Sequence, residues 1–470
     1  MPPSDPSLTL GSVRRRMLTG SAWVLAARVL GLGLGVAING LLARMLDPSE
    51  FGAFLLTSTM VVIGSTLSKV GMDRTVVRFA AESLATGDPG RARHSIRMAV
   101  GWAALASAGV AAVLALGVGQ WFFGSVLDQP LVASVVPVAA GWLFATAMQS
   151  VLAESFRGLS RFGYASVFQT FASDLLTVAV LGAVFVSART IHLSAAIGLL
   201  TAVAAVVLAI TGLVLARTVR HLHGPGRLGR AEMFKVARPL IVTNVGIYLL
   251  GHGVDLWILG AFQSAEQVSL YGAAAKLVVL VATPMIIFSG VMPPLVAELY
   301  AQGRTRRLER TLRVGATIVG VPALAVLMVF VVAAPWVLEV VYGPFYRQAA
   351  PLLLVMSLAR VIAVWTGSCG IALMMTGHQR DMMHTTLLSA VISIVGGLLL
   401  AGPYGAMGVA VATSVAQVVQ NVSQLLLAHR RLGIWTHVSF SWVEVREFFR
   451  PSGRSESGGV EPPGPARTDQ

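Results

Sequence analysis

Five charged residues lie inside otherwise apolar stretches of this sequence, and their types suggest anion binding and ion coupling. They are Arg28, Asp174, Asp255, Lys276 and Arg360. A charge inside a membrane span costs about 3 kcal/mol on insertion scales, so such residues usually face a bundle interior or a water-filled cavity. Guanidinium and ammonium groups bind phosphate, and buried carboxylates can exchange protons. We therefore expect Arg28, Lys276 and Arg360 to bind an anionic substrate, and Asp174 and Asp255 to couple its movement to H⁺ or Na⁺.

Each of these residues also has a purely structural interpretation. Counting from the ends of the predicted spans puts Asp255 and Lys276 at one depth, where a buried ion pair could simply hold two helices together. Arg28 and Asp174 match in the same way from the opposite side of the membrane. Arg28, about 10 Å from its end of the span, could instead snorkel to the membrane surface. The sequence leaves both interpretations open.

Other polar residues of the apolar stretches are expected to have ordinary roles. Lys69 and Glu154 stand at the ends of predicted spans, where water would solvate them. Gln417, Gln420 and Asn421 lie within a span, and such side chains more often bond between helices than bind a ligand.

Several kinds of chemistry lack the residues that they need. The single cysteine, Cys369, excludes an intramolecular disulfide, and no Cys/His cluster has the spacing of a metal site. The glycines of residues 31–35 follow no strand, so we interpret them as a close-packing helix face rather than a dinucleotide fingerprint. No Walker A sequence is present, which argues against an ATP-driven pump. We expect no catalytic residue, no metal and no cofactor.

Composition places the chain among polytopic membrane proteins. Of its 470 residues, 55% are hydrophobic and only 12% are charged, whereas soluble proteins have about 25% charged residues. The net charge of +14 would suggest nucleic acid as a partner of a soluble protein. Here an excess of Arg and Lys on the cytoplasmic side of a membrane explains it better, so no nucleic-acid partner is expected.

Hydropathy predicts about twelve transmembrane helices, since lipid offers no partner to exposed backbone groups. The predicted spans are 21–43, 51–71, 97–118, 130–153, 166–187, 191–216, 239–261, 268–293, 312–334, 349–375, 382–402 and 405–428. Alternate loops are rich in arginine, and the opposite loops contain only Arg44, Arg189 and Arg347. This asymmetry predicts a multi-pass protein of the plasma (inner) membrane with both termini in the cytoplasm.

Two basic loops indicate an internal duplication. The stretch 87–97 (GDPGRARHSIR) aligns with 303–313 (GRTRRLERTLR), at an offset of 216 residues. A repeat of six spans enters the membrane twice in the same orientation. The fold class we expect is therefore an all-α polytopic membrane protein with two six-helix lobes, related by a pseudo-two-fold axis along the membrane normal.

The same observations divide the chain into segments. A stretch that mixes Trp, Phe and charge follows the last span and suits a short interfacial helix, and the final residues are rich in Ser, Gly and Pro. The expected segments are a basic cytoplasmic N-terminus (1–20), an N-terminal lobe (21–216), a cytoplasmic linker (217–238), a C-terminal lobe (239–432), an interfacial segment (433–450) and a disordered cytoplasmic tail (451–470).

The order of several degenerate motifs resembles the polysaccharide transporter family of lipid-linked oligosaccharide flippases, within the multidrug/oligosaccharidyl-lipid/polysaccharide exporter superfamily. The motifs are ARVLG, LLARMLDPSEFGAF, KVGMDRTVVRFAAE, VDLWILGAFQSAEQVSLYGAAAK, MPPLVAELYAQG, VYGPFYRQAAPLLLVMSLAR, LMMTGHQR and YGAMGVAVATSVAQ. The resemblance implies an inverted V of two six-helix lobes. It implies movement of polyprenyl-diphosphate-linked sugars from the cytoplasmic to the outer leaflet, and Arg28 and Lys276 fit the cationic cavity positions of some relatives.

From the residues and the resemblance together we predict an oligosaccharide-lipid flippase that works by alternating access, with glycosyltransferases and a glycan polymerase as partners. Cation-coupled export of drugs on the same fold is the main alternative. The excess of embedded cations over acids disfavours it, because cationic drugs call for acidic sites. A membrane enzyme or a scaffold of cell-envelope glycan assembly is a further alternative, although the outer loops are short for an enzyme.

Overall fold

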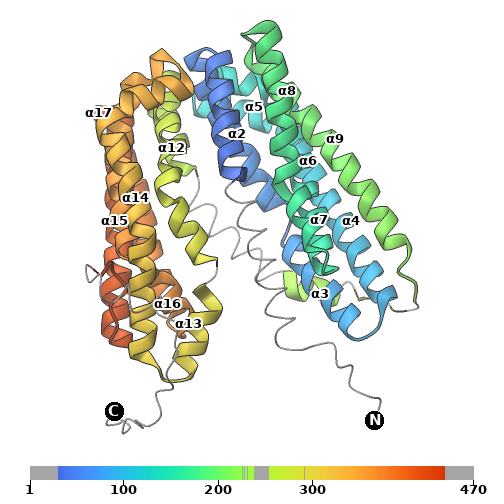
Figure 1. Ribbon diagram of the computed structural model, residues 1–470. Helices are drawn as coiled ribbons and strands as arrows, with labels where there is room; N and C mark the ends of the chain where they lie inside the picture. The colour runs from blue at the N-terminus through green and yellow to red at the C-terminus, as the bar shows by residue number, and fades with distance from the viewer. Residues whose placement is uncertain are drawn as a thin grey trace.

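A computed structural model of the chain describes residues 30–224, 226, 228–229, 231–237, 253–290 and 292–439. Every regular element within these residues is a helix (Figure 1), which confirms the predicted all-α fold class. The elements of the first half are an apolar helix Leu30–Met45, α2 Pro48–Ser68, α3 Met72–Ala85, α4 Pro89–Val113, η1 Leu114–Val118, α5 Gly119–Trp121, η2 Phe122–Val126, α6 Pro130–Gly158, α7 Phe162–Ser166, η3 Val167–Phe171, α8 Ala172–Ala188 and α9 Leu193–Arg220. Those of the second half are α11 Val254–Phe262, α12 Ala265–Ser289, α13 Met292–Ala301, α14 Thr305–Tyr342, η4 Pro344–Ala349, α15 Ala350–Trp365, α16 Cys369–Met375 and α17 Gln379–Leu432.

Nine helices of the described chain are long and apolar enough to cross a membrane. The longest, α17, has 54 residues, or about 80 Å of helix against a hydrocarbon core of about 30 Å. It reverses direction at Gly405, which has φ 55° and ψ −140°. The Ser389 hydroxyl donates to the Ala416 carbonyl at 2.9 Å, so the two halves lie side by side. One continuous element thus makes two passes, as the predicted spans 382–402 and 405–428 require.

The structure describes only part of the first and of the seventh predicted span. The helix Leu30–Met45 and α11 contain the latter parts of the predicted first and seventh spans, and the residues before them lie outside the described chain. Together with the two passes of α17, these two helices and the eight other long helices account for the predicted twelve.

Prolines and one aspartate set where several helices begin. Pro48, Pro89 and Pro130 occupy the first positions of α2, α4 and α6, where a missing N–H group costs nothing and a fixed φ favours the helix. The Asp88 carboxylate accepts a hydrogen bond from the backbone N–H of Arg91 at 2.9 Å and caps α4.

The elements repeat in order along the chain. The starting residues of α2 and α12, Pro48 and Ala265, are 217 positions apart, and those of α4 and α14, Pro89 and Thr305, are 216 apart. A short helix stands between the two long helices in each half: α3 lies between α2 and α4, and α13 lies between α12 and α14. The elements form two lobes that converge at one end and separate toward the other (Figure 1).

Aromatic and backbone contacts join the lobes at the end that we call the sealed end. Phe51 of α2 packs edge-on against Tyr346, with ring centroids 5.8 Å apart, and also contacts Tyr342. Gly52 meets the backbone of α12: a Cβ atom there would lie 1.8 Å from the Ala265 carbonyl oxygen. One apolar core, containing buried residues of both lobes, continues across this contact.

Arg44 adds a polar clasp at the sealed end. Its guanidinium crosses from the first lobe to the C-terminal turn of α14, where it donates to the carbonyls of Val341 (3.2 Å), Glu339 (3.3 Å) and Val340. A helix C-terminus carries partial negative charge and unpaired carbonyls, so a cation there is stabilising. This arginine, predicted only as a loop residue, therefore holds the two lobes together.

The opposite end is built from two separate cores. In the first lobe Met72, Phe79 and Phe156 belong to one cluster, while Met292 and Leu308 belong to another in the second lobe. We call this the basic end, because α3, the first turns of α4 and α14 and the last turns of α6 and α9 carry most of the described arginines. A shared core at one end and separate cores at the other produce the V shape.

Two local expectations differ from the structure. Gly31, Gly33 and Gly35 form no close-packing contact within the described residues, since none of their atoms lies within 4 Å of a Cβ built at any of the three. Residues 434–439 of the expected interfacial segment are not helical, and the Val438 N–H donates to the Trp365 carbonyl at 3.0 Å. Residues 440–450, the tail 451–470 and the N-terminus 1–20 lie outside the described chain.

Candidate functional site

Lys276 lies where the two lobes begin to separate. Ala265, Gly272 and Lys276 fall within about 40° of one another around α12, at about 100° per residue. Ala265 and Gly272 both contact α2: a Cβ at Gly272 would lie 2.3 Å from Cδ1 of Leu55. Lys276 continues this face by one turn and is exposed, whereas Gly272 and Leu277 beside it are buried. Its side chain therefore lies on the face of α12 that meets the first lobe, one turn beyond the contact with α2.

Asp255 belongs to the packing of the second lobe. It lies in the first turn of α11, and its Oδ2 accepts a hydrogen bond of 2.6 Å from the Tyr271 hydroxyl of α12. That hydroxyl is also 3.4 Å from Oγ1 of Thr413, and the Tyr271 side chain is fully buried. This arrangement fixes the carboxylate among α11, α12 and α17.

The suggested ion pair between Asp255 and Lys276 is not formed. Their charges interact through space, but no nitrogen–oxygen distance between them is 4.0 Å or less. Lys276 makes no hydrogen bond or ion pair within the described chain, and the Asp255 carboxylate accepts a hydrogen bond from Tyr271 instead. An exposed ammonium group without a direct counter-ion in the described chain is suited to bind an anion.

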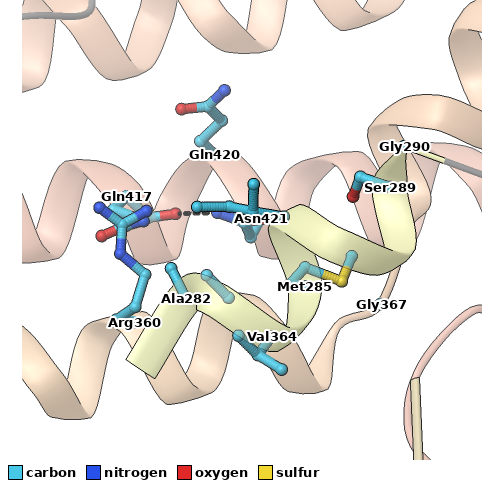
Figure 2. Close-up of a pocket in the computed structure, with 12 residues that line it drawn as sticks. Ala282, Met285, Ser289, Gly290, Arg360, Val364, Gly367, Gln417, Gln420 and Asn421 are labelled. Carbon is cyan, nitrogen blue, oxygen red and sulfur yellow. Dashed lines mark hydrogen bonds between the residues drawn. The ribbon is translucent and has the colours of Figure 1, made fainter. Parts of the chain in front are cut away.

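Arg360 lines a polar pocket inside the second lobe. The pocket has a volume of about 560 Å³ and lies between the end of α12, α15 and the second pass of α17. Arg360 and Gln417 both line the pocket, and in Figure 2 the amide of Gln420 points away from the Arg360 side chain. Asn421 and Ser289 contribute further polar groups to the lining. The pocket therefore offers one cation, three amides and a hydroxyl to a ligand.

Arg360 has no partner among the described residues. Its Nε atom is buried without a hydrogen bond, and no ion pair is formed by the guanidinium. A buried cation that lacks a counter-ion is costly, and an anionic ligand or water would offset that cost. The guanidinium of Arg360 can bind a phosphate group in a bidentate manner, since it presents paired N–H donors.

Lys276 and Arg360 do not share one cavity. Lys276 does not line the Arg360 pocket, and Met285, which does, points about 180° away from Lys276 around α12 at about 100° per residue. The two cations thus flank α12, one toward the other lobe and one toward α15. Arg28, the third predicted cation, lies outside the described chain.

Asp174 lies apart from these residues, in the first lobe. It stands half-buried in the first turn of α8, immediately after the π-helical turn η3. No hydrogen bond or ion pair to its carboxylate occurs within the described chain. The adjacent Ser173 hydroxyl accepts a hydrogen bond of 2.7 Å from the Gln149 amide of α6. Asp174 is therefore available to a cation or a proton.

A buried polar network near Asp174 was not foreseen. Lys69 and Glu154 were expected to be solvated at span ends, but their exposed fractions are only 9% and 7%. Lys69 pairs with Asp73 at 3.4 Å, and Arg157 donates to Glu154 at 2.6 Å and to Gln169 at 2.8 Å. The i,i+3 spacing of Glu154 and Arg157 was an available signal, because such residues meet on one helix face. Lys69 and Asp73 are brought together by the turn between α2 and α3.

Gln417, Gln420 and Asn421 of α17 combine the two roles considered for them, hydrogen bonding between helices and lining a ligand site. Gln420 donates to the Thr386 hydroxyl at 3.3 Å, a bond between the two passes of α17 as expected. The Asn421 amide donates within its own helix to the Gln417 carbonyl at 2.9 Å. All three side chains nevertheless line the Arg360 pocket. Within the described chain, no group of three or more His, Cys, Asp or Glu residues could hold a metal ion.

Solved structures share this fold at low sequence identity. A multidrug resistance transporter in an inward-facing conformation matches with a TM-score of 0.69 and 12% identity, over 86% of this chain and 94% of that one. The lipid II flippase MurJ in an inward closed conformation matches with a TM-score of 0.63 and 12% identity, over 87% of each chain. A superfamily transporter from Pyrococcus furiosus Vc1, described as having a binding pocket of reverse polarity, matches with a TM-score of 0.59 and 13% identity, over 89% and 95%.

Sequence comparison identifies the family. No curated protein sequence matches this chain. Residues 17–299, more than half of the chain, match the family described as "Polysaccharide biosynthesis protein". The chain belongs to this polysaccharide biosynthesis protein family, and its fold is the polytopic transporter fold of the multidrug/oligosaccharidyl-lipid/polysaccharide exporter superfamily.

Proposed function

We propose that this protein moves a polyprenyl-diphosphate-linked oligosaccharide from the cytoplasmic to the outer leaflet, for assembly of a surface polysaccharide. The observation that carries the proposal is Lys276, an exposed cation without a direct counter-ion in the described chain, on the face of α12 that meets the first lobe. A diphosphate head group is anionic and hydrophilic while its tail stays in lipid. Its transfer needs a cationic, hydrated path with lateral access, which two separated lobes offer.

The orientation follows from the arginines. The basic end carries most of them, and positively charged loops stay in the cytoplasm. We place the basic end and both termini on the cytoplasmic side of the plasma (inner) membrane, so that the space between the lobes opens to the cytoplasm. Glycosyltransferases that build the lipid-linked unit and a polymerase that consumes it are the expected partners.

Alternating access supplies the mechanism. In the cytoplasm-open state the Arg44 clasp and the Phe51 contacts close the outer side. The diphosphate approaches Lys276, and the polar Arg360 pocket receives phosphate or sugar groups. Rocking of one lobe against the other then closes the basic end and opens the sealed end. Arg28, predicted in the first span, is proposed as a further cation on this path.

Flipping in proteoliposomes tests the proposal. The purified protein is expected to speed the transfer of a fluorescent polyprenyl-diphosphate oligosaccharide between leaflets, relative to protein-free vesicles. Arg360→Ala is expected to lower the rate about tenfold, the usual worth of one charge-assisted hydrogen bond. Arg380→Ala, at an exposed site of the basic end, is the matched control. Absence of any flipping by the wild-type protein would refute the function.

Cation-coupled drug export remains the second candidate, and the structural match to a multidrug transporter favours it. The same vesicles, loaded with a cationic fluorescent drug and given a proton or sodium gradient, separate the two. Drug movement without lipid flipping would replace the proposed function. We expect the opposite result, because Lys276 and Arg360 repel a cation.

Asp255 and Asp174 are the proposed coupling residues. Asp255→Asn keeps an acceptor for the Tyr271 hydroxyl but removes the charge next to Lys276. If Asp255 carries the coupling proton, this variant should flip at a rate that no longer varies with pH, while the wild-type rate does vary. Tyr271→Phe disturbs the same contact without removing the carboxyl group, so it serves as the control. An unchanged pH profile in Asp255→Asn rules out this role.

A further inference from the structure

A second basic site lies on the flank of the first lobe that faces away from the other lobe. A groove of about 760 Å³ is lined by α4, α6 and α9, and α4 and α9 lie on the side of the first lobe away from the second (Figure 1). Three arginines line it at the basic end: Arg93 and Arg97 of α4 and Arg220 of α9. Above them the lining is almost entirely apolar.

The arginines of the groove lack counter-ions. Nε of Arg93 is buried without a hydrogen bond, and none of the three forms an ion pair within the described chain. Neighbouring Arg91, by contrast, pairs with Glu232 at 2.8 Å. A cluster of cations at a membrane surface attracts an anionic head group, and guanidinium groups bind phosphate oxygens in pairs.

The apolar part of the groove has the length of one lipid leaflet. Arg220 and Leu208 mark its two ends along α9, twelve residues or about 18 Å apart, and half of a hydrocarbon core is about 15 Å. Glycines leave room along it. A Cβ at Gly101 would meet no atom within 4 Å, and one at Gly212 would meet only Leu152, at 3.8 Å.

We propose that this groove binds an anionic phospholipid of the leaflet at the basic end, with its phosphate on Arg93, Arg97 and Arg220 and one acyl chain along α9. The charge complementarity and the leaflet-length apolar wall identify this occupant. The site does not depend on the proposed transport function, because it faces away from the space between the lobes. A lipid there wedges α4 against α9 and stabilises the first lobe.

Thermal unfolding and native mass spectrometry of the detergent-purified protein test this site. Phosphatidylglycerol is expected to raise the unfolding temperature and to remain bound, and phosphatidylcholine with the same chains is not. The triple variant Arg93→Gln, Arg97→Gln, Arg220→Gln should bind phosphatidylglycerol about tenfold or more weakly, since each phosphate contact is worth about a factor of ten. Arg304→Gln, Arg307→Gln, Arg380→Gln removes the same charge from exposed sites of the second lobe and should bind normally.

A groove-filling variant separates a lipid from a free phosphate. Gly101→Leu adds a side chain where space is open and improves helix propensity, so it should fold and yet bind the lipid more weakly. Equal losses in the two triple variants would overturn the proposal, because binding would then be general charge attraction. Unweakened binding in Gly101→Leu, or saturation by glycerol phosphate alone, would also overturn it. So would stronger retention of a polyprenyl diphosphate than of phosphatidylglycerol, which would make the groove a cargo site.

Discussion

Replacement of Lys276 by alanine is expected to reduce flipping of a polyprenyl-diphosphate oligosaccharide by about ten- to a hundredfold. A hydrogen bond to a charged group is worth about 1.5–3 kcal/mol, and each 1.4 kcal/mol is a factor of ten. Lys276 makes no hydrogen bond or ion pair within the described chain, so the loss should fall on cargo binding rather than on folding. The initial rate in proteoliposomes at subsaturating cargo measures it.

Two matched variants make this result specific. Lys276→Arg keeps a cation on this face of α12 and should retain most of the rate. Lys235→Ala removes an exposed lysine of the basic end and should have almost no effect. If Lys276→Ala flips at the wild-type rate with unchanged protein level, Lys276 is not a cargo residue. If Lys276→Arg is as slow as Lys276→Ala, the position tolerates no change of shape and the charge argument fails.

Gly52→Leu is expected to force the sealed end apart. A Cβ atom at this position would lie 1.8 Å from the Ala265 carbonyl oxygen, a separation at which backbone must move. Because α12 and α2 hold the lobes together here, the clash cannot be relieved by turning one side chain. The buried α2–α12 interface should therefore become accessible to solvent.

Cysteine labelling measures that opening. Ser269 of α12 is completely buried in the parent chain, with an exposed fraction of 0%. A cysteine introduced there by Ser269→Cys, in a Cys369→Ala background, should therefore react slowly with a polar maleimide. Adding Gly52→Leu should speed labelling at least several-fold. Gly109→Leu is the control, because a Cβ at Gly109 would meet no atom within 4 Å. Equal labelling rates in the two double variants would contradict the assigned role of the Gly52 contact.

The transmembrane architecture was largely predictable from the sequence. Hydropathy and the distribution of arginine depend on the residue types in each window, and they need no knowledge of neighbours in space. The predicted division near residue 405 coincides with the reversal at Gly405 in the middle of α17. The offset of 216 between two basic loops reappears in the starts of α4 and α14.

Side-chain partnerships were much less predictable. Depth counting placed Asp255 beside Lys276, and the two charges do interact, yet Tyr271 takes the carboxylate. Lys69 and Glu154 were assigned to solvated span ends, but α3 and α6 bury them. Depth along a helix is set by sequence position. The direction in which a side chain points also depends on how its helix is rotated and tilted against others.

The sequence by itself thus determined the class of protein, the membrane spans, the duplication and the set of embedded charges, because these are local or periodic properties of the chain. Only the tertiary structure decided that Lys276 faces the other lobe while Arg360 faces a pocket within its own. It also assigned Arg44 to a clasp, and it shows no packing contact between the glycines of residues 31–35 and the rest of the described chain. These outcomes depend on how helices that are far apart in the sequence pack on one another, and no local pattern encodes the rotation of one helix against another.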